Sequence, residues 1–136
     1  WKGLSHRRIT ALDVNSTALK DYYQAIYFPG GYAYYYKREI NTEGLHHIRD
    51  LVASGGGYIG ICAGAYFASD SVYWEEDGLI DYPLDLFDGV AAGALDDIAP
   101  WDGYTMTTLT MNPADSINQY EPASEDMLYY GGPVFR

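Results

Sequence analysis

The chain has 136 residues, of which 48% are hydrophobic, as expected for one globular domain with its own core. It carries 19 Asp and Glu against 8 Lys and Arg, for a net charge of −11. This acidity disfavours binding to nucleic-acid phosphates, and no apolar run is long enough to predict a membrane span. We therefore predict a soluble protein without nucleic-acid or membrane partners. The lack of a visible signal peptide favours a cytoplasmic location, while the oligomeric state stays open.

Short elements are predicted in the first third of the chain. Residues 9–13 are typical of a strand, Asn15-Ser16-Thr17 of a turn, and residues 17–22 of a short helix. Asn15-Ser16-Thr17 also matches a glycosylation acceptor, but the turn is the favoured interpretation. The apolar run at 24–28 indicates a strand buried on both faces, as in parallel sheets. The tyrosine-rich residues 32–36 are predicted to be a loop.

The remaining elements predict an α/β fold. Residues 42–53 place Leu45, Ile48 and Leu51 at helical spacing, and a buried strand at 58–61 follows. Further strands are predicted at 72–74, 104–111 and 127–130. The alternation of strand and helix in the first half predicts a mostly parallel sheet, and the second half reads as β-rich.

One segment, Gly55 to Ser69 (GGGYIGICAGAYFAS), has the pattern of a nucleophile elbow, a sharp strand-to-helix turn with a reactive residue at its apex. Cys62 is the apex, and Gly60 and Gly64 leave room for its strained backbone. A helix beginning at Ala63 would direct its N–H groups and positive dipole end toward the sulfur, which favours the thiolate. The alternative interpretation is an inert, buried cysteine.

A glycine pair lies where the other parallel strand ends. Phe28-Pro29-Gly30-Gly31 follows the strand at 24–28, and parallel strands open their carboxyl ends on one sheet edge. The N–H groups of Gly30 or Gly31 and of Ala63 are then candidates for an oxyanion hole. An ordinary tight turn is the alternative. The tyrosines that follow, Tyr32 first, either line a pocket mouth or pack as a loop.

The sequence offers no clear general base. A cysteine nucleophile needs an imidazole nearby, and the three histidines, His6, His46 and His47, all precede Cys62. A surface or packing role is favoured for each of them. The aspartates between 81 and 102 lack calcium-loop spacing, and Gly55-Gly56-Gly57 precedes a strand instead of following one. We therefore predict no metal and no cofactor.

FPGGYAYYYKREIN and GGGYIGICAGAYFAS together resemble the class I glutamine amidotransferase-like superfamily. Within it, the chain is most similar to the N-terminal domain of eukaryotic-type biotin–protein ligases and its stand-alone relatives. The similarity is continuous over 26–69 and fainter through 86–93 and 129–133. It implies a flavodoxin-like three-layer sandwich with Cys62 as nucleophile and Gly31 and Ala63 as oxyanion hole. Candidate substrate contacts, toward a small-molecule amide or carboxylate, are Gly30, Tyr32 and Gly64.

The chain departs from the superfamily pattern in three ways. The superfamily normally opens with an extra strand and closes with a His-x-Glu pair, so residues 1–136 resemble a single domain without these segments. Ala63 replaces the histidine of the protease-like branch. The leading hypothesis is acyl transfer or amide hydrolysis at Cys62. The alternative is a non-catalytic ligand-binding or protein-interaction module that keeps the elbow, and a redox-sensing thiol is a third hypothesis.

Overall fold

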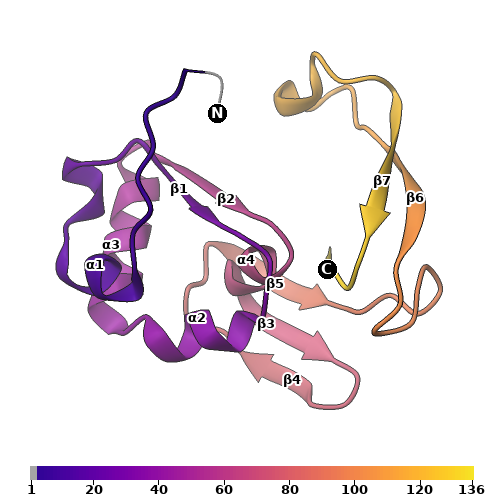
Figure 1. The fold of residues 1–136 in the computed structure, drawn as a ribbon, viewed down its shortest axis with the longest axis horizontal. Helices are drawn as coiled ribbons and strands as arrows, with labels where there is room; N and C mark the ends of the chain where they lie inside the picture. The colour runs from indigo at the N-terminus through magenta and orange to yellow at the C-terminus, as the bar shows by residue number, and fades with distance from the viewer. Residues whose placement is uncertain (1–2) are drawn as a thin grey trace.

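Two short parallel strands with helices packed against them place Cys62 in the computed structural model, which describes residues 3–136 (Figure 1). β1 (Ala25–Phe28) pairs in parallel with β2 (Gly57–Gly60), so that Phe28 lies opposite Gly60. Ile26 and Phe28 are buried, whereas Tyr27 on the other face is exposed. One face of this pair therefore belongs to the core and the other is open.

Helix α3 (Thr42–Ala53) packs on the core face of these strands, and it confirms the helix predicted at 42–53. Asn41 caps it by accepting a hydrogen bond from the Gly44 N–H at 3.0 Å. Leu45, Ile48 and Leu51 are buried along one side, as the apolar spacing requires.

Two predicted elements are wrong because local capping and ring packing determine them. Residues 9–13 do not form a strand: Thr10 and Asp13 make a capping box that starts helix α1 (Ala11–Ser16). Residues 32–36 are not a loop, because helix α2 (Ala33–Glu39) forms there. Tyr36 of α2 packs its ring at 5.2 Å from that of Phe28, which holds the helix on the core. The predicted helix at 17–22 is reduced to the 3-10 turn η1 (Leu19–Asp21).

Asn15 links α1 to the helices that follow it. Its amide nitrogen donates to the Glu39 carbonyl at 2.9 Å, and its amide oxygen accepts from the Asn41 N–H at 3.0 Å. Asn15 and Ser16 end α1, and the chain leaves the helix at Thr17, so the residues predicted as a turn lie at a helix end. The nitrogen and the oxygen of the Asn15 side-chain amide therefore both bond to main-chain groups outside helix α1.

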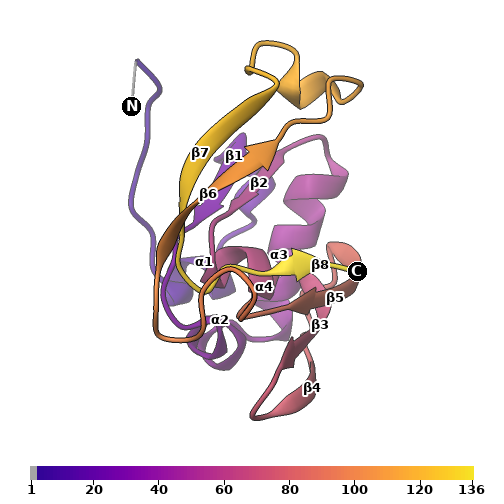
Figure 2. The same cartoon turned by 90° about the vertical axis from the view of Figure 1, so that its right-hand side faces the viewer.

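The second half of the chain is β-rich. Four strands form one sheet in the order β4-β3-β5-β8, and they are β3 (Ser69–Trp74), β4 (Gly78–Asp81), β5 (Phe87–Ala92) and β8 (Val134–Phe135). Two further strands, β6 (Thr105–Thr110) and β7 (Ser124–Tyr129), form a separate antiparallel pair, with the turn η2 (Ser116–Asn118) between them. This hairpin projects from the rest of the molecule (Figures 1 and 2).

The mixed α/β class is confirmed, as is the parallel pairing of the two strands around the glycines. A single, mostly parallel sheet is not confirmed, because the strands divide among three small sheets. In the part of the chain that the structure describes, parallel pairing is limited to β1–β2 and β3–β5. Among the helices within residues 3–136, none combines the length and the apolar character needed to cross a bilayer.

We expect Asn15→Ala to lower the free energy of unfolding by about 1–3 kcal/mol, because it leaves the Glu39 carbonyl and the Asn41 N–H without partners. Urea denaturation followed by circular dichroism measures this. Ser16→Ala is the matched control, since the Ser16 hydroxyl bonds only to Leu12 within the same helix. Equal stabilities of the two variants would contradict the tertiary role of Asn15.

Candidate functional site

Cys62 lies at the turn between β2 and helix α4 (Ala63–Phe67), in a backbone conformation that side chains rarely adopt. Its φ is 51° and its ψ is −108°, and its side chain is half-buried. Such a conformation costs on the order of 1–3 kcal/mol and persists only where the surroundings enforce it. Holding Cys62 in this conformation therefore lowers the stability of the folded state.

Glycines enforce the turn by close backbone contact. A Cβ on Gly60 would lie 2.5 Å from the Gly64 carbonyl oxygen, and a Cβ on Gly64 would overlap the Phe28 carbonyl. The Tyr58 hydroxyl donates a hydrogen bond to the Gly64 carbonyl at 2.7 Å. Strand β2, helix α4 and the end of β1 are thus locked together around Cys62.

The structure brings the glycine pair after β1 next to the cysteine. A Cβ on Gly30 would lie 3.4 Å from the Cys62 Cβ and 4.0 Å from its Sγ. Gly31 adopts a φ of 145°, which favours glycine. Within residues 3–136, the N–H groups of Gly31 and Ala63 donate no hydrogen bond. Two unused donors therefore lie on the segments that flank the Cys62 turn.

The other two predicted contact residues have different surroundings. Tyr32 is exposed, and its ring lies 5.4 Å from that of Tyr35 and 5.9 Å from that of Tyr34. Gly64 is buried against the main chain of Phe28, where it serves packing. The Tyr32 side chain is therefore accessible to a ligand, whereas Gly64 allows helix α4 to pack closely on the main chain of Phe28.

Two tyrosines near Cys62 escaped prediction from the sequence. The Tyr36 hydroxyl donates to the Pro29 carbonyl at 3.0 Å, and the buried Tyr66 hydroxyl donates to the Gly131 carbonyl at 3.0 Å. Burial raises the pKa of both phenols, and a negative charge on Cys62 adds to both shifts. Tyr66 stands one helical turn after Cys62, and that spacing is the signal that could have indicated it.

None of the histidines of residues 3–136 contacts Cys62. His46 is exposed on α3. The His47 Nδ1 lies 2.8 Å from the Val14 carbonyl and its Nε2 lies 3.4 Å from Glu43. His6 is exposed, with its Nδ1 3.4 Å from the Leu4 carbonyl. The packing and surface roles expected for these side chains fit their positions.

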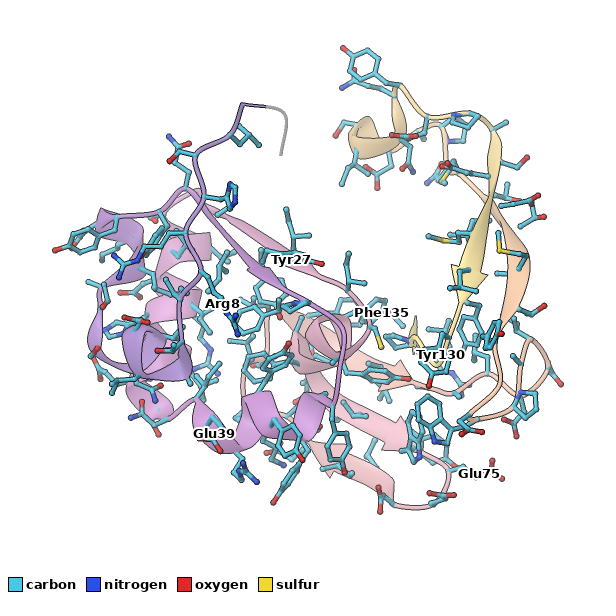
Figure 3. The ribbon with its side chains drawn as sticks, viewed as in Figure 1. Arg8, Tyr27, Glu39, Glu75, Tyr130 and Phe135 are labelled. Atoms are coloured by element: carbon cyan, nitrogen blue, oxygen red, sulfur yellow. The ribbon has the colours of Figure 1, made fainter. Side chains whose placement is uncertain are left out.

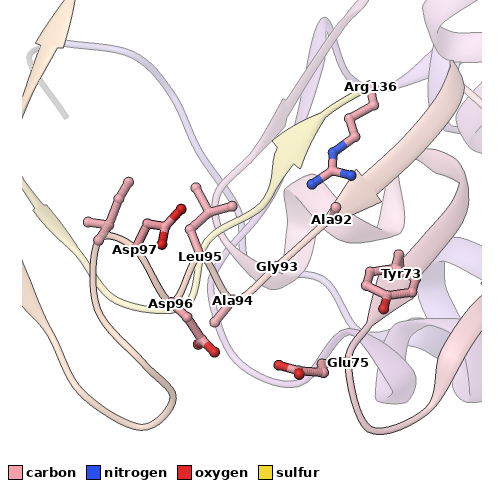
Figure 4. A pocket seen from close by; sticks show the side chains of 10 residues that line it. Tyr73, Glu75, Ala92, Gly93, Ala94, Leu95, Asp96, Asp97 and Arg136 are labelled. Atoms are coloured by element: carbon pink, nitrogen blue, oxygen red, sulfur yellow. The ribbon is translucent and has the colours of Figure 1, made fainter.

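A hollow lies away from Cys62, beside the loop that follows β5 (Figure 4). It has a volume of about 460 Å³, and Glu75, Asp96, Asp97 and Arg136 lie around it. Cys62 is not among the residues that line this hollow. Over the described residues, no three His, Cys, Asp or Glu side chains are grouped as a metal ion would require.

The fold and the site together define an α/β domain with a cysteine held at a glycine-framed strand-to-helix turn. A family model described as "Biotin-protein ligase, N terminal" matches residues 7–136, so the chain belongs to the biotin–protein ligase N-terminal family. A comparison with curated proteins finds no match.

Adding a methyl group inside the glycine frame is expected to destabilise the domain. For Gly60→Ala and Gly64→Ala we expect losses of about 1–3 kcal/mol or more, because each Cβ meets backbone that cannot move aside. Thermal and urea unfolding measure the loss. Gly132→Ala is the matched control, since nothing lies within 4 Å of its added Cβ. Equal effects at Gly60, Gly64 and Gly132 would disprove the close packing.

Tyr58 is expected to make stability depend on alkaline pH. Burial raises the pKa of its phenol, with a smaller contribution from Tyr36, so the unfolded chain ionises first. The stabilisation is complete below about pH 10 and is lost as the pH rises beyond it. Tyr58→Phe should cost about 1 kcal/mol at neutral pH through the lost bond to Gly64, and should flatten the alkaline decline.

Urea unfolding of both proteins at about pH 8 and about pH 10.5 tests this difference. Tyr120→Phe controls for the removal of one exposed phenol. A decline of the same steepness in Tyr58→Phe and in the unaltered chain would assign the pH dependence to other groups.

Proposed function

We propose that this biotin–protein ligase-related module is a glutamine amidotransferase-like domain in which Cys62 is the nucleophile of an elbow. The observation that carries the proposal is the strained, half-buried cysteine between strand β2 and helix α4, with Gly30 beside its sulfur. The parallel pairing of β1 and β2 supports a flavodoxin-like core, because it opens both carboxyl ends toward one edge.

The proposed reaction is acyl transfer from, or hydrolysis of, a small amide. The Cys62 thiolate attacks the carbonyl carbon, so that a C–S bond forms and the carbonyl oxygen becomes an oxyanion. The N–H groups of Gly31 and Ala63, which have no partner in residues 3–136, are the donors proposed for that oxyanion. Collapse breaks the C–N bond, and water or an acceptor then cleaves the thioester.

Proton transfer is the step of this reaction for which the described residues offer the fewest candidate groups. The departing nitrogen needs a proton, and no described histidine reaches Cys62 to deliver one. The buried phenols of Tyr36 and Tyr66 have raised pKa values, so they stay protonated at neutral pH and do not act as bases. The proton is therefore taken from water. Hydrolysis of the thioester also proceeds without a general base, so we expect slow turnover with an acyl-enzyme that accumulates.

The second candidate function is a non-catalytic ligand-binding or protein-interaction module. Two observations favour it. Among residues 3–136 no imidazole reaches Cys62, and exposed tyrosines lie at the start of α2 beside the Gly30–Gly31 turn, namely Tyr32, Tyr34 and Tyr35. In this case Cys62 is retained for the geometry of the turn. The two functions differ in whether the sulfur reacts.

The decisive measurement is the rate of Cys62 alkylation by iodoacetamide as a function of pH, with Cys62→Ser as the blank. We expect the native protein to be labelled, and faster than a free thiol at neutral pH. N-acetylcysteine provides the reference curve. A rate at or below that of the reference, or labelling only after unfolding, would contradict a nucleophilic role and favour the binding module.

Where Cys62 proves activated, intact-mass analysis after incubation with L-glutamine tests the amide reaction. A mass increase that is absent in Cys62→Ser would show the acyl-enzyme. An activated thiol without any acyl adduct would favour redox sensing over acyl transfer.

A further inference from the structure

A second hollow, with aromatic walls, adjoins the one beside the loop that follows β5. It has a volume of about 210 Å³ and shares Glu75, Ala94 and Asp96 with the first hollow. Two indoles and three carboxylates line this tryptophan hollow, namely those of Trp74, Trp101, Glu75, Glu76 and Asp96. Cys62 is not part of its lining, so any ligand here is separate from the reaction proposed at the cysteine.

Ring packing holds both indoles of the tryptophan hollow in place. The rings of Trp74 and Trp101 are nearly perpendicular, at 81°, and their centroids are 5.5 Å apart. Tyr66 packs on Trp74 at 6.1 Å, and Tyr130 stacks on Trp101 at 5.4 Å. Trp101 is 54% exposed even with Tyr130 on one of its faces. Figure 3 labels Tyr130 and Glu75 in this region. The aromatic walls are therefore fixed before a ligand arrives and remain accessible to it.

The carboxylates of the tryptophan hollow are not neutralised within the fold. Among residues 3–136, Glu75, Glu76 and Asp96 form no ion pair and no side-chain hydrogen bond. Arg136, which lines the first hollow, forms no ion pair either. Figure 4 shows its guanidinium on the opposite side of that hollow from Glu75. Unbalanced negative charge therefore lies beside the two indoles.

Indole faces and carboxylates both attract cations, and indole is the best aromatic partner for one. A bare metal ion does not suit this hollow, since no three His, Cys, Asp or Glu side chains of residues 3–136 are grouped as a metal ion requires. A primary ammonium is strongly hydrated and has three N–H groups to satisfy. A quaternary ammonium has no N–H, and aromatic rings are its usual partners in proteins.

We propose that the tryptophan hollow binds a small quaternary ammonium ion. Its methyl groups lie against Trp74 and Trp101, and its charge lies next to Glu75 and Asp96. The size of the hollow suits such an ion, because pockets for drug-sized molecules have volumes of about 300–1,000 Å³. A neutral molecule of the same shape makes the apolar contacts but loses the attraction to the rings and the carboxylates. Charge therefore determines the specificity of the site.

Titration of the chain with choline chloride, followed by proton NMR at constant ionic strength, tests this site. We expect saturable binding with a dissociation constant on the order of 1 mM. The methyl signal of choline should move upfield, because its protons lie over aromatic rings. Dimethylbutanol, which has carbon in place of the choline nitrogen, is the matched neutral ligand. It should bind at least about fivefold more weakly.

Substitutions that preserve shape separate the charge from the rings. Glu75→Gln and Asp96→Asn should each raise the choline dissociation constant about threefold. Trp101→Ala should raise it at least about fivefold. Glu121→Gln and Tyr120→Ala, at exposed residues that do not line the hollow, are the matched controls and should leave it unchanged. Circular dichroism verifies that each variant is folded.

Equal affinities for choline and dimethylbutanol would overturn the proposal, because the hollow would then take only apolar groups. A choline signal that does not saturate by about 50 mM would overturn it as well. A loss of affinity in Glu121→Gln as large as that in Glu75→Gln would assign the binding to the net charge of the chain, and would reject a local site.

Discussion

The close approach of helix α4 to the two strands before it is the constraint on which the site depends. Gly60 and Gly64 remove the side chains that would separate them, and the Phe28 carbonyl occupies the space of a Cβ. Main chain in contact with main chain leaves the connecting residue no relaxed conformation. Cys62 is therefore strained as a consequence of packing, and its sulfur stays half-buried at the sheet edge. Any reaction of Cys62 therefore depends on the close contact between helix α4 and strands β1 and β2.

The parts of the fold that the sequence predicted are those with a local signal. Helix α3 shows an apolar period of 3.6 residues, an Asn cap and a glycine stop, and strand β1 is a continuous apolar run. Helix α2 was missed because consecutive tyrosines have little intrinsic helix propensity. It forms because the ring of Tyr36 packs against Phe28, a tertiary contact that residues 32–36 do not reveal.

Strand pairing lies beyond what such patterns determine. β3 is parallel to β5 and antiparallel to β4, and the two-residue strand β8 completes the sheet from near residue 135. For the site, the sequence indicated Cys62 and its glycines, since spacing alone encodes the turn. It did not indicate Tyr66, because the bond from Tyr66 to Gly131 joins residues that only the finished fold brings together.

That bond has a consequence for how the protein is made. Tyr66 and Gly131 are 65 residues apart, and Tyr129 adds bonds to Leu95 and Gly132 in the same region. Contacts this distant in sequence close late in folding. During synthesis, helix α4 cannot form the hydrogen bond from Tyr66 to Gly131 until residue 131 has left the exit tunnel of the ribosome. Until then, the thiol beside that helix is less restrained than in the finished fold.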